Sequence, residues 1–349
     1  MPNATNIPFQ RVLDALLDSE STFPPRYLYQ FSDLEPKEVA ELAKIWDQVP
    51  GWRRLALMED IEELGLNDLL LSFETLGRFA LKDSDGKIRL LALRILGEYE
   101  SSDLATTYLQ MLESDSEMEV RAAAATALGR FVYDGETEAI PEKLYQRILD
   151  RLLSVVNGAD AELVRRMALE SLGFSCHEQV PSLIDTAFHS DSIDWVASAL
   201  FAMGRSANEH WAPQVLSMLE SKMPAVRQEA ARAAGELEIR QALTRLYELL
   251  DDPDEETRLA SIWSLSQIGG NGVREALELL YSESEDDDEQ AYLEKALDNL
   301  EYTEEIRLMP FFELPEQDLE EDYDEDDGLV WFTGDGIEEE DDDEEDPVD

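Results

Sequence analysis

The residues that could bind a metal ion are few and widely spaced. The chain has three histidines, His177, His189 and His210. A zinc-hydrolase helix needs two histidines four residues apart with a glutamate between them, because that spacing puts both rings on one face. The segment from His177 to Pro181 begins His-Glu but lacks the second histidine. We therefore predict no metal site and no cofactor, and we interpret His177 as a polar residue in a turn.

A single cysteine, Cys176, precedes His177 and superficially suggests a nucleophile. Adjacent side chains on a turn or helix point in different directions, and no acid orients this pair by sequence. We interpret Cys176 as a packed or partly buried thiol. The acidic run that begins at Asp322 has Asp327 and Thr333 at the sixth and twelfth positions, where a calcium loop needs glycine and glutamate. The glycines of 269–272 do not follow a strand as in a nucleotide loop. The sequence therefore predicts no catalytic residue and no enzyme.

The charge of the chain limits its partners. Its 349 residues include 80 acidic and 28 basic side chains, a net charge of −52. This excludes direct binding to nucleic acid or to an anionic membrane, because both are polyanions. No apolar run reaches the roughly 18 residues of a membrane span, and no secretory signal is visible at Met1 to Gln10. With a single cysteine, these features predict a cytoplasmic protein, which we expect to be monomeric.

The acidity is greatest at the carboxyl end. Residues 310–349 contain 21 acidic side chains and no lysine or arginine. Like charges at this density repel one another and cannot bury a core, so we predict a disordered acidic tail over residues 301–349. One apolar segment interrupts it, formed by Leu329, Val330, Trp331 and Phe332. That segment is either a docking peptide or a solvated stretch, and the sequence leaves both open.

A motif recurs along the rest of the chain. It is an arginine followed three residues later by a small residue and then, in most copies, by glycine. The arginines are Arg53, Arg89, Arg121, Arg165, Arg227 and Arg258, and Val196 takes this place in one copy. The steps are 36, 32, 44, 31, 31 and 31 residues. A period near 31 with helical apolar spacing predicts helix pairs, in which we interpret the glycine as a left-handed helix terminator. The longest step predicts a longer loop near Tyr133 to Pro141.

This pattern resembles HEAT repeats over about residues 52–300. The resemblance implies an all-α, right-handed α-solenoid of about seven helix pairs, with an armadillo-like fold. It also implies a structural ladder in which the aspartate of a turn pairs with the arginine of the next helix. The implied pairs are Asp83 with Arg89, Asp115 with Arg121 and Asp252 with Arg258, and Arg165 and Arg227 occupy the same motif position. Val196 would leave a weaker seam.

The resemblance extends to families with known activities. Phycobilisome lyases contain similar short repeats, and deoxyhypusine hydroxylases hold two irons through several His-Glu pairs. This chain has one such pair, His177-Glu178, so hydroxylase activity is not expected.

Three regions are predicted from these patterns. Residues 1–51 form a helical cap with helices over 9–17 and 36–49, the second with Val39, Leu42 and Trp46 on one face. Residues 52–300 form the solenoid, whose last helix is predicted over 289–300. Residues 301–349 form the tail. A cap is expected because the end of a solenoid must cover its core.

The side of the motif helix opposite its apolar face predicts a binding surface. Apolar residues fall at −1, +3, +6 and +7 from the arginine, which leaves +1, +5 and +9 opposite them. In HEAT solenoids this helix lines the concave face. The basic and aromatic members of this strip are Arg94, Arg130, Phe174, Phe201, Arg205, Arg232 and Trp263. Two alternatives remain: the arginines pair along their own helices, as Arg94 with Glu98, Arg166 with Glu170 and Arg232 with Glu236, or the aromatic residues turn into the core.

These observations predict a non-enzymatic scaffold that binds an unknown protein partner on the concave face. One alternative is a chaperone or acidic mimic that binds basic proteins through the tail. Another is a tetrapyrrole-handling protein similar to the phycobilin lyases. The Trp331 segment of the tail could also dock on the strip when no partner is present, or serve only for solubility.

Overall fold

The computed structural model describes residues 7–99 and 101–308. Contacts divide the chain into two compact units, Met1–Ile306 and Arg307–Asp349, and only Arg307 and Leu308 of the second are described. The described residues form helices and no strand, which confirms the predicted all-α class. Leu329, Val330, Trp331 and Phe332 lie outside the described residues, so the docking segment stays a prediction.

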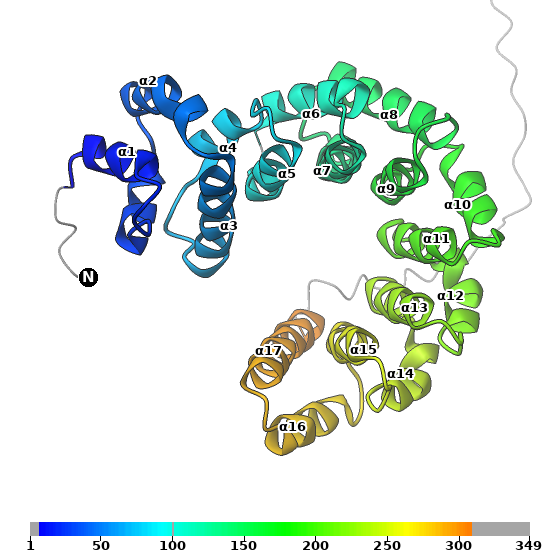
Figure 1. Ribbon diagram of the computed structural model, residues 1–349. Helices are drawn as coiled ribbons and strands as arrows, with labels where there is room; N and C mark the ends of the chain where they lie inside the picture. Colours follow the sequence, from blue (N-terminus) through cyan, green and yellow to red (C-terminus); the bar gives the residue numbers. More distant parts are fainter. Residues whose placement is uncertain (1–6, 100, 309–349) are drawn as a thin grey trace, which may run out of the picture. The chain divides into compact units, whose positions relative to one another are not determined.

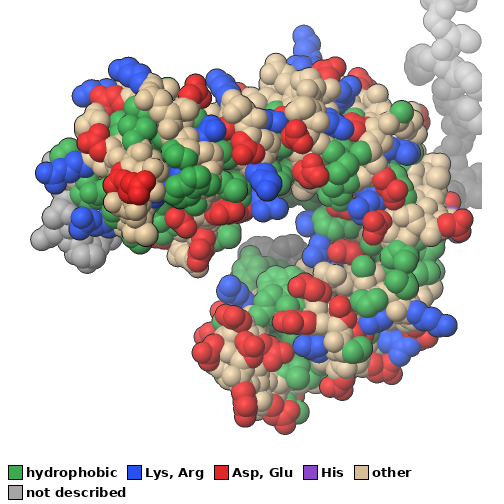
Figure 2. Space-filling model, in the orientation of Figure 1, with side chains coloured by type: hydrophobic (Ala, Val, Ile, Leu, Met, Phe, Trp, Pro, Cys, Tyr) green, Lys and Arg blue, Asp and Glu red, His purple; other side chains and the backbone are tan. Residues whose placement is uncertain are grey.

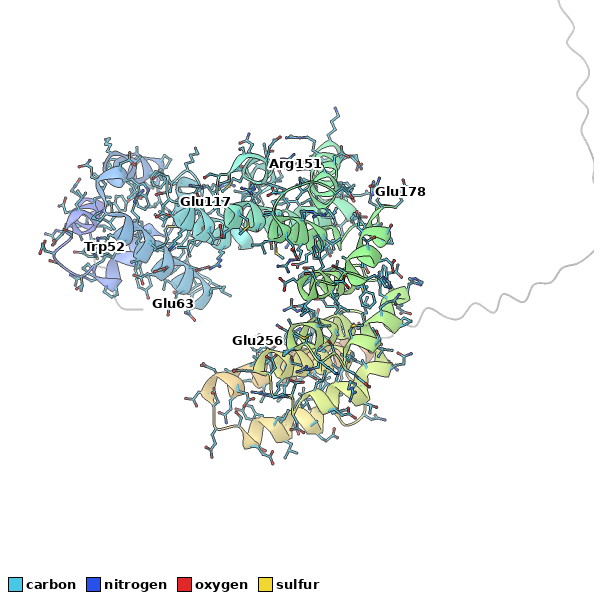
Figure 3. The ribbon with its side chains drawn as sticks, turned by 45° about the vertical axis from the view of Figure 1, so that its right-hand side comes forward. Trp52, Glu63, Glu117, Arg151, Glu178 and Glu256 are labelled. Atoms are coloured by element: carbon cyan, nitrogen blue, oxygen red, sulfur yellow. The ribbon has the colours of Figure 1, made fainter. Side chains whose placement is uncertain are left out.

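Within the first unit the helices alternate between two rows (Figure 1). The inner row consists of α3 (Gly51–Asn67), α5 (Gly86–Ile95), α7 (Met118–Glu136), α9 (Glu162–Leu172), α11 (Ile193–Arg205), α13 (Pro224–Glu236) and α15 (Glu255–Ile268). The outer row consists of α4 (Glu74–Ala80), α6 (Ser102–Ser114), α8 (Glu142–Val156), α10 (Val180–Phe188), α12 (Ala212–Met218), α14 (Leu243–Leu249) and α16 (Val273–Glu283). Figure 3 labels Arg151 on the outer helix α8 and Glu256 on the inner helix α15.

From α5 to α13, each inner-row helix contacts the outer helix that precedes it and the next inner helix, and α15 contacts α14. Short 3₁₀ helices η3 (Leu96–Glu98), η4 (Glu209–Trp211) and η5 (Arg240–Ala242) join some of these elements. Helix α17 (Asp287–Leu308) follows α16 and begins and ends outside the predicted range of 289–300. The described residues thus hold seven helix pairs, from α4–α5 to α16–α17, and confirm the predicted α-solenoid.

Aspartates in the turns start the inner helices. The Asp83, Asp115 and Asp252 carboxylates each accept the backbone N–H two residues later, at 2.8 to 3.0 Å. Aspartate favours such turns because its side chain replaces a backbone acceptor. The apolar motif positions then face the core, as Ile88 and Ala92 show, since both are fully buried. The helical spacing therefore places the apolar face as the sequence predicts.

The N-terminal segment is built from α1 (Phe9–Leu17), η1 (Pro25–Phe31), α2 (Pro36–Ile45) and η2 (Trp46–Gln48). The helix predicted over 36–49 ends at Ile45 and continues as the 3₁₀ helix η2. Trp46 is buried, and its Nε1–H donates to Asp83 Oδ2 at 2.6 Å. This bond joins the N-terminal segment to the turn between α4 and α5.

The interpretation of the motif glycines as left-handed terminators is wrong for most copies. Gly173 has φ −53°, and among the described motif glycines only Gly269 has a positive φ, 60°. The glycines instead lie where neighbouring inner helices approach closely. A Cβ added to Gly173 would lie 2.8 Å from Ala202 Cα, and one added to Gly235 would lie 2.7 Å from Ser264 Cα. The motif needs glycine for space, whereas Gly269 ends α15 with a positive φ that favours glycine.

The predicted long loop over 133–141 is also wrong. Helix α7 continues to Glu136 and α8 begins at Glu142, so the inserted residues lengthen the helices and leave a short connection. Phe131 and Val132 are buried and continue the apolar face of α7. Glu136 then accepts hydrogen bonds from Ser175 Oγ and Cys176 N, both at 2.8 Å, which ties the end of α7 to the turn after α9.

Candidate binding surface

The structural ladder runs between neighbouring repeats, one step away from the pairing that the sequence implied. Nε and Nη2 of Arg89 donate to both oxygens of Asp115, at 2.8 and 2.6 Å. Arg121 pairs in the same way with Asp160, and Arg227 with Asp252. Within one repeat, the arginine contacts the backbone carbonyl of the implied aspartate and not its carboxylate. Nη1 donates to the aspartate carbonyl oxygen, as from Arg89 to Asp83 at 2.8 Å, and likewise from Arg121 to Asp115 and Arg258 to Asp252 at 2.9 Å.

The physical reason is the direction of the aspartate side chain. Each carboxylate accepts from its own turn and faces the arginine of the preceding repeat. Asp83, for example, pairs with Arg54 at 2.7 Å. For Arg89, Arg121 and Arg227, the side-chain partner is therefore the aspartate of the following repeat.

Around α11 the arginine–aspartate pairs of the ladder are replaced by other contacts. Arg165 Nε donates to the Val156 carbonyl oxygen at 2.9 Å, and its guanidinium carbon lies 5.3 Å from the ring centre of Trp195. Val196 supplies no guanidinium group to the next junction. Helix α11 still contacts both α9 and α13. The loss of the arginine at Val196 therefore changes the kind of contact between these repeats. That this junction is weaker than the others stays a prediction.

On the inner row, two phenylalanines and two arginines from the turn after α9, from α11 and from α13 come together. The Arg205 guanidinium carbon lies 5.1 Å from the ring centres of both Phe174 and Phe201. The Arg232 guanidinium carbon lies 5.4 Å from the Phe201 ring centre. Cations favour the faces of aromatic rings, so this stacking holds the guanidinium groups in place. We call Phe174, Phe201, Arg205 and Arg232 the inner-face cluster.

Three partly buried glutamates lie close to the arginines of the inner-face cluster. Arg205 Nε is 3.7 Å from Glu236 Oε1, and Arg232 Nη1 is 3.7 Å from Glu229 Oε2. The arginine side chains are 36% and 38% exposed, whereas Glu236 and Glu229 are 18% and 16% exposed. Burial raises the pKa of both glutamates. The cluster therefore presents guanidinium groups outward, above partly buried carboxylates.

Glu170 of α9 is the third glutamate. Ser198 Oγ donates to its Oε1 at 2.6 Å. Burial raises the pKa of Glu170 to about 7, although the hydrogen bond from Ser198 and the charges of Arg166 and Arg232 act in the opposite direction. Near neutral pH this carboxyl therefore carries only part of its charge, which limits the negative charge beneath the arginines.

The matches to known proteins agree with this geometry. Residues 73–142 and 212–298 match the family model for HEAT repeats. The helical solenoid therefore contains HEAT repeats over these residues. Among curated proteins, none matches it.

Solved structures with a similar HEAT or armadillo fold have low sequence identity to this solenoid. The CpcE–CpcF complex of the phycocyanin lyase from a Nostoc species has 19% identity and a TM-score of 0.45, and the match covers 65% of this chain and 94% of that one. YibA from Escherichia coli has 17% identity and a TM-score of 0.40, with 81% and 98% covered. A designed armadillo repeat protein in complex with a Lys-Arg peptide has 20% identity and a TM-score of 0.35, with 56% and 98% covered.

The other predicted residues of the HEAT solenoid lie apart from the cluster. Arg94 of α5 is about half exposed and lies 3.8 Å from Glu62 of α3. Arg130 of α7 is also about half exposed and pairs with Asp134 of its own helix at 2.9 Å. Trp263 of α15 is partly buried, and its ring centre lies 6.2 Å from that of Tyr292. Figure 2 shows basic side chains beside acidic ones on the inner edge of the solenoid.

Two predicted pairings along single helices differ in the structure. Arg166 Nη2 lies 3.5 Å from Asp194 Oδ2 of the neighbouring α11. Arg232 lies nearest Glu229, three residues before it, where the sequence suggested Glu236. The helical wheel gives the direction of a side chain but not the distance to the next helix, and the next helix supplies the closer carboxylate for Arg166.

Sequence reasoning missed Glu229 and Tyr292. Glu229 falls outside the strip at +1, +5 and +9, yet it stands three residues before Arg232 and so shares its helix face. That spacing was a usable signal. Tyr292 lies on α17, and its hydroxyl group donates to the Leu259 carbonyl oxygen at 3.2 Å. No motif position pointed to that contact.

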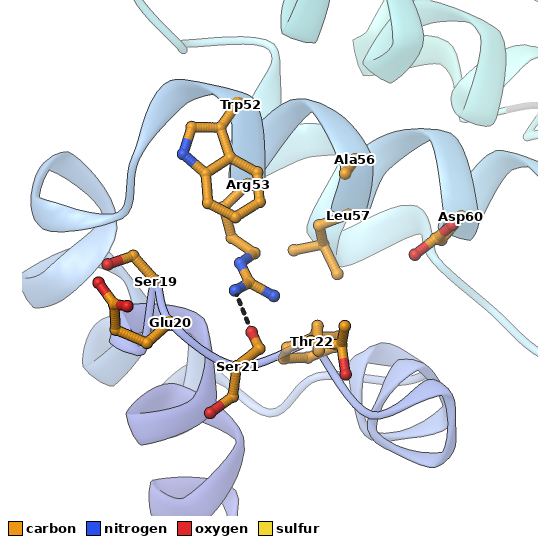
Figure 4. Close-up of a pocket in the computed structure, with 10 residues that line it drawn as sticks. Ser19, Glu20, Ser21, Thr22, Trp52, Arg53, Ala56, Leu57 and Asp60 are labelled. Carbon is orange, nitrogen blue, oxygen red and sulfur yellow. Dashed lines mark hydrogen bonds between the residues drawn. The ribbon is translucent and has the colours of Figure 1, made fainter.

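A pocket of about 330 Å³ lies near the N-terminus, between α3 and the segment 19–23 (Figure 4). Arg53, the first copy of the motif arginine, is 4% exposed, and its Nη2 donates to the carbonyl oxygens of Asp18 and Ser21 at 2.8 and 2.6 Å. Trp52 is 57% exposed, and the Arg53 guanidinium carbon lies 4.6 Å from its ring centre. Glu20 and Asp60 also line the pocket. With acids and a base on its walls, the pocket favours neither sign of charge.

The interpretation of Cys176 as a packed or partly buried thiol is wrong, because the residue is exposed. The negative charge of Glu136 raises the pKa of this thiol, and a hydrogen bond with Glu136 acts in the same direction. A raised pKa lowers the fraction of thiolate, the reactive form. His177 is partly exposed in the turn before α10, as predicted. Over residues 7–99 and 101–308, no three His, Cys, Asp or Glu side chains gather as metal ligands would, and no helix has the length and apolar character of a membrane span.

Proposed function

We propose that the protein is a non-enzymatic scaffold that holds a partner protein against the inner-face cluster. The observation that carries this proposal is the position of Arg205, which lies against both Phe174 and Phe201 while more than a third of its side chain stays exposed. Aromatic and arginine side chains contribute most to protein interfaces because they combine apolar area with hydrogen-bond donors. Stacked helix pairs also provide an extended surface on which such a cluster is held rigidly.

Site-specific photo-crosslinking tests this proposal. The full-length chain would be produced in its native cell with p-azidophenylalanine at Phe201, and separately at Tyr281 on the outer helix α16 as a matched control. Tyr281 is 40% exposed, so it is accessible without belonging to the cluster. We expect one protein to crosslink from Phe201 and not from Tyr281.

A second variant connects the crosslink to the cluster. Arg205→Ala removes the side chain that bridges the two rings, and we expect it to weaken the Phe201 crosslink strongly. Equal crosslinking from positions 201 and 281, or an unchanged product in the Arg205→Ala chain, would contradict the proposed function.

A further inference from the structure

The arginines of this chain fall into two groups by what their donors contact. In the ladder, Arg89 and Arg227 each place two nitrogens on both oxygens of one aspartate, at 2.6 to 2.8 Å. In the inner-face cluster, the nearest carboxylate oxygens of Arg205 and Arg232 are 3.7 Å away, beyond hydrogen-bond distance. Arg205 Nε is buried and finds no hydrogen-bond partner among the described residues. The neighbouring Glu236 and Glu229 therefore accept no hydrogen bond from the guanidinium groups of Arg205 and Arg232.

The acids beneath the arginines are held in place by packing. A Cβ on Gly204 would lie 2.6 Å from Glu236 Oε2, so this carboxylate sits against the backbone of α11. Glu229 Oε2 is buried and accepts no hydrogen bond from the described residues. The arginines in turn lie against phenylalanine rings. Each arginine is therefore packed on one side, while the exposed third of its side chain is accessible to a ligand.

The spacing of the two guanidinium groups sets the size of a ligand. Both guanidinium carbons lie within 5.4 Å of the Phe201 ring centre, so they are at most about 11 Å apart. The roughly 7 Å between alternate residues of an extended chain falls within this limit. A planar guanidinium group binds a carboxylate through two parallel hydrogen bonds. The strongly negative charge of the whole chain repels long polyanions. A short segment with two carboxylates is therefore the best match.

We infer that Arg205 and Arg232 bind two carboxylate side chains, one residue apart, in an extended acidic segment of the partner protein. The inference rests on the proposed function and gives the chemistry of the bound segment. The Phe201 ring lies within 5.4 Å of both guanidinium carbons and supplies an apolar contact for the same segment.

Peptide binding to the full-length protein tests this inference. The probe is a dye-labelled peptide in which two glutamates are separated by one residue, and the matched peptide has glutamine at both positions. Fluorescence anisotropy reports the affinity. A charge-assisted hydrogen-bonded pair contributes enough for roughly a tenfold change in affinity. We expect the glutamate peptide to bind at least about tenfold more tightly than the glutamine peptide.

Variants assign this difference to the two arginines. Arg205→Gln and Arg232→Gln should each weaken binding of the glutamate peptide about tenfold and leave the glutamine peptide unaffected. Arg240→Gln is the control, because Arg240 is exposed in η5, apart from the cluster. Melting curves followed by circular dichroism would establish that the variants are folded.

Two outcomes would overturn the inference. One is equal affinity for the two peptides, or no binding of either. The other is an unchanged affinity in the two cluster variants. If Phe201 still crosslinks a partner in either case, the proposed function stands and only the acidic character of the bound segment is wrong. If that crosslink is also absent, the proposed function fails as well.

Discussion

Arg89 and Asp115 join two repeats through a single guanidinium group. Nε and Nη2 of Arg89 donate to the two carboxylate oxygens of Asp115, while its Nη1 donates to the Asp83 and Ser84 carbonyl oxygens at 2.8 and 3.2 Å. Both side chains are largely buried. One arginine thus connects the turn before α5 to the turn before α7, and the same arrangement recurs at Arg121.

The first prediction concerns this pair. Arg89→Lys keeps the charge but cannot reproduce three differently directed contacts, so Asp115 would lose part of its pairing in a largely buried site. We expect a loss of about 2–3 kcal/mol in the free energy of unfolding, measured by urea denaturation. Arg147→Lys on the exposed side of α8 is the control and should change it by less than about 0.5 kcal/mol. Equal stability of the two variants would show that the pair contributes nothing.

The second prediction compares two glycines at the same motif position. A Cβ on Gly173 would lie 2.8 Å from Ala202 Cα and 2.9 Å from Ala202 O, so α9 and α11 would have to separate. At Gly97, an added Cβ meets no heavy atom within 4 Å among the described residues. We expect Gly173→Ala to destabilise the fold by about 2 kcal/mol or more. We expect Gly97→Ala to be neutral or slightly stabilising, since alanine restricts the unfolded chain.

Thermal denaturation of the two variants checks this pair of expectations. A Gly173→Ala melting temperature equal to that of the unmodified chain would mean that the helices accommodate the methyl group. The close-packing role of the motif glycines would then be wrong.

The third prediction concerns pH. Burial raises the pKa of Glu170 from 4.5 to about 7 in the folded chain. Between these values the folded state binds a proton that the unfolded state has released, so stability falls as pH rises from about 4.5 to about 7. Glu170→Gln keeps an oxygen that accepts from Ser198 and has no charge to bury. We expect this variant to be more stable than the unmodified chain by roughly 1–2 kcal/mol at about pH 8.

The size of this difference should itself depend on pH. It should shrink towards zero as pH is lowered to about 4.5, where Glu170 is protonated in the folded chain. Chemical denaturation at a series of pH values measures it. A constant difference across this range would mean that the ionisation of Glu170 does not affect folding.

Much of the fold could be predicted from the sequence because helical repeats depend on local patterns. Apolar residues at helical spacing determined the helix pairs and the face that each inner helix buries, as at Ile88 and Ala92. The same wheel placed Phe201, Arg205 and Arg232 on one strip, and in the structure both guanidinium carbons lie within 5.4 Å of the Phe201 ring centre. Within one helix, direction follows from residue number alone.

What only the tertiary structure decided is the distance and order between neighbouring helices. The sequence suggested Asp83 as the partner of Arg89, whereas the carboxylate of the following repeat, Asp115, lies within hydrogen-bond distance. The sequence suggested that Gly173 ends its helix in a left-handed conformation, whereas in the structure Ala202 approaches so closely that no side chain fits at position 173. A helical period specifies the angle of each side chain around its own axis, but the contact made at that angle depends on how closely the next helix packs.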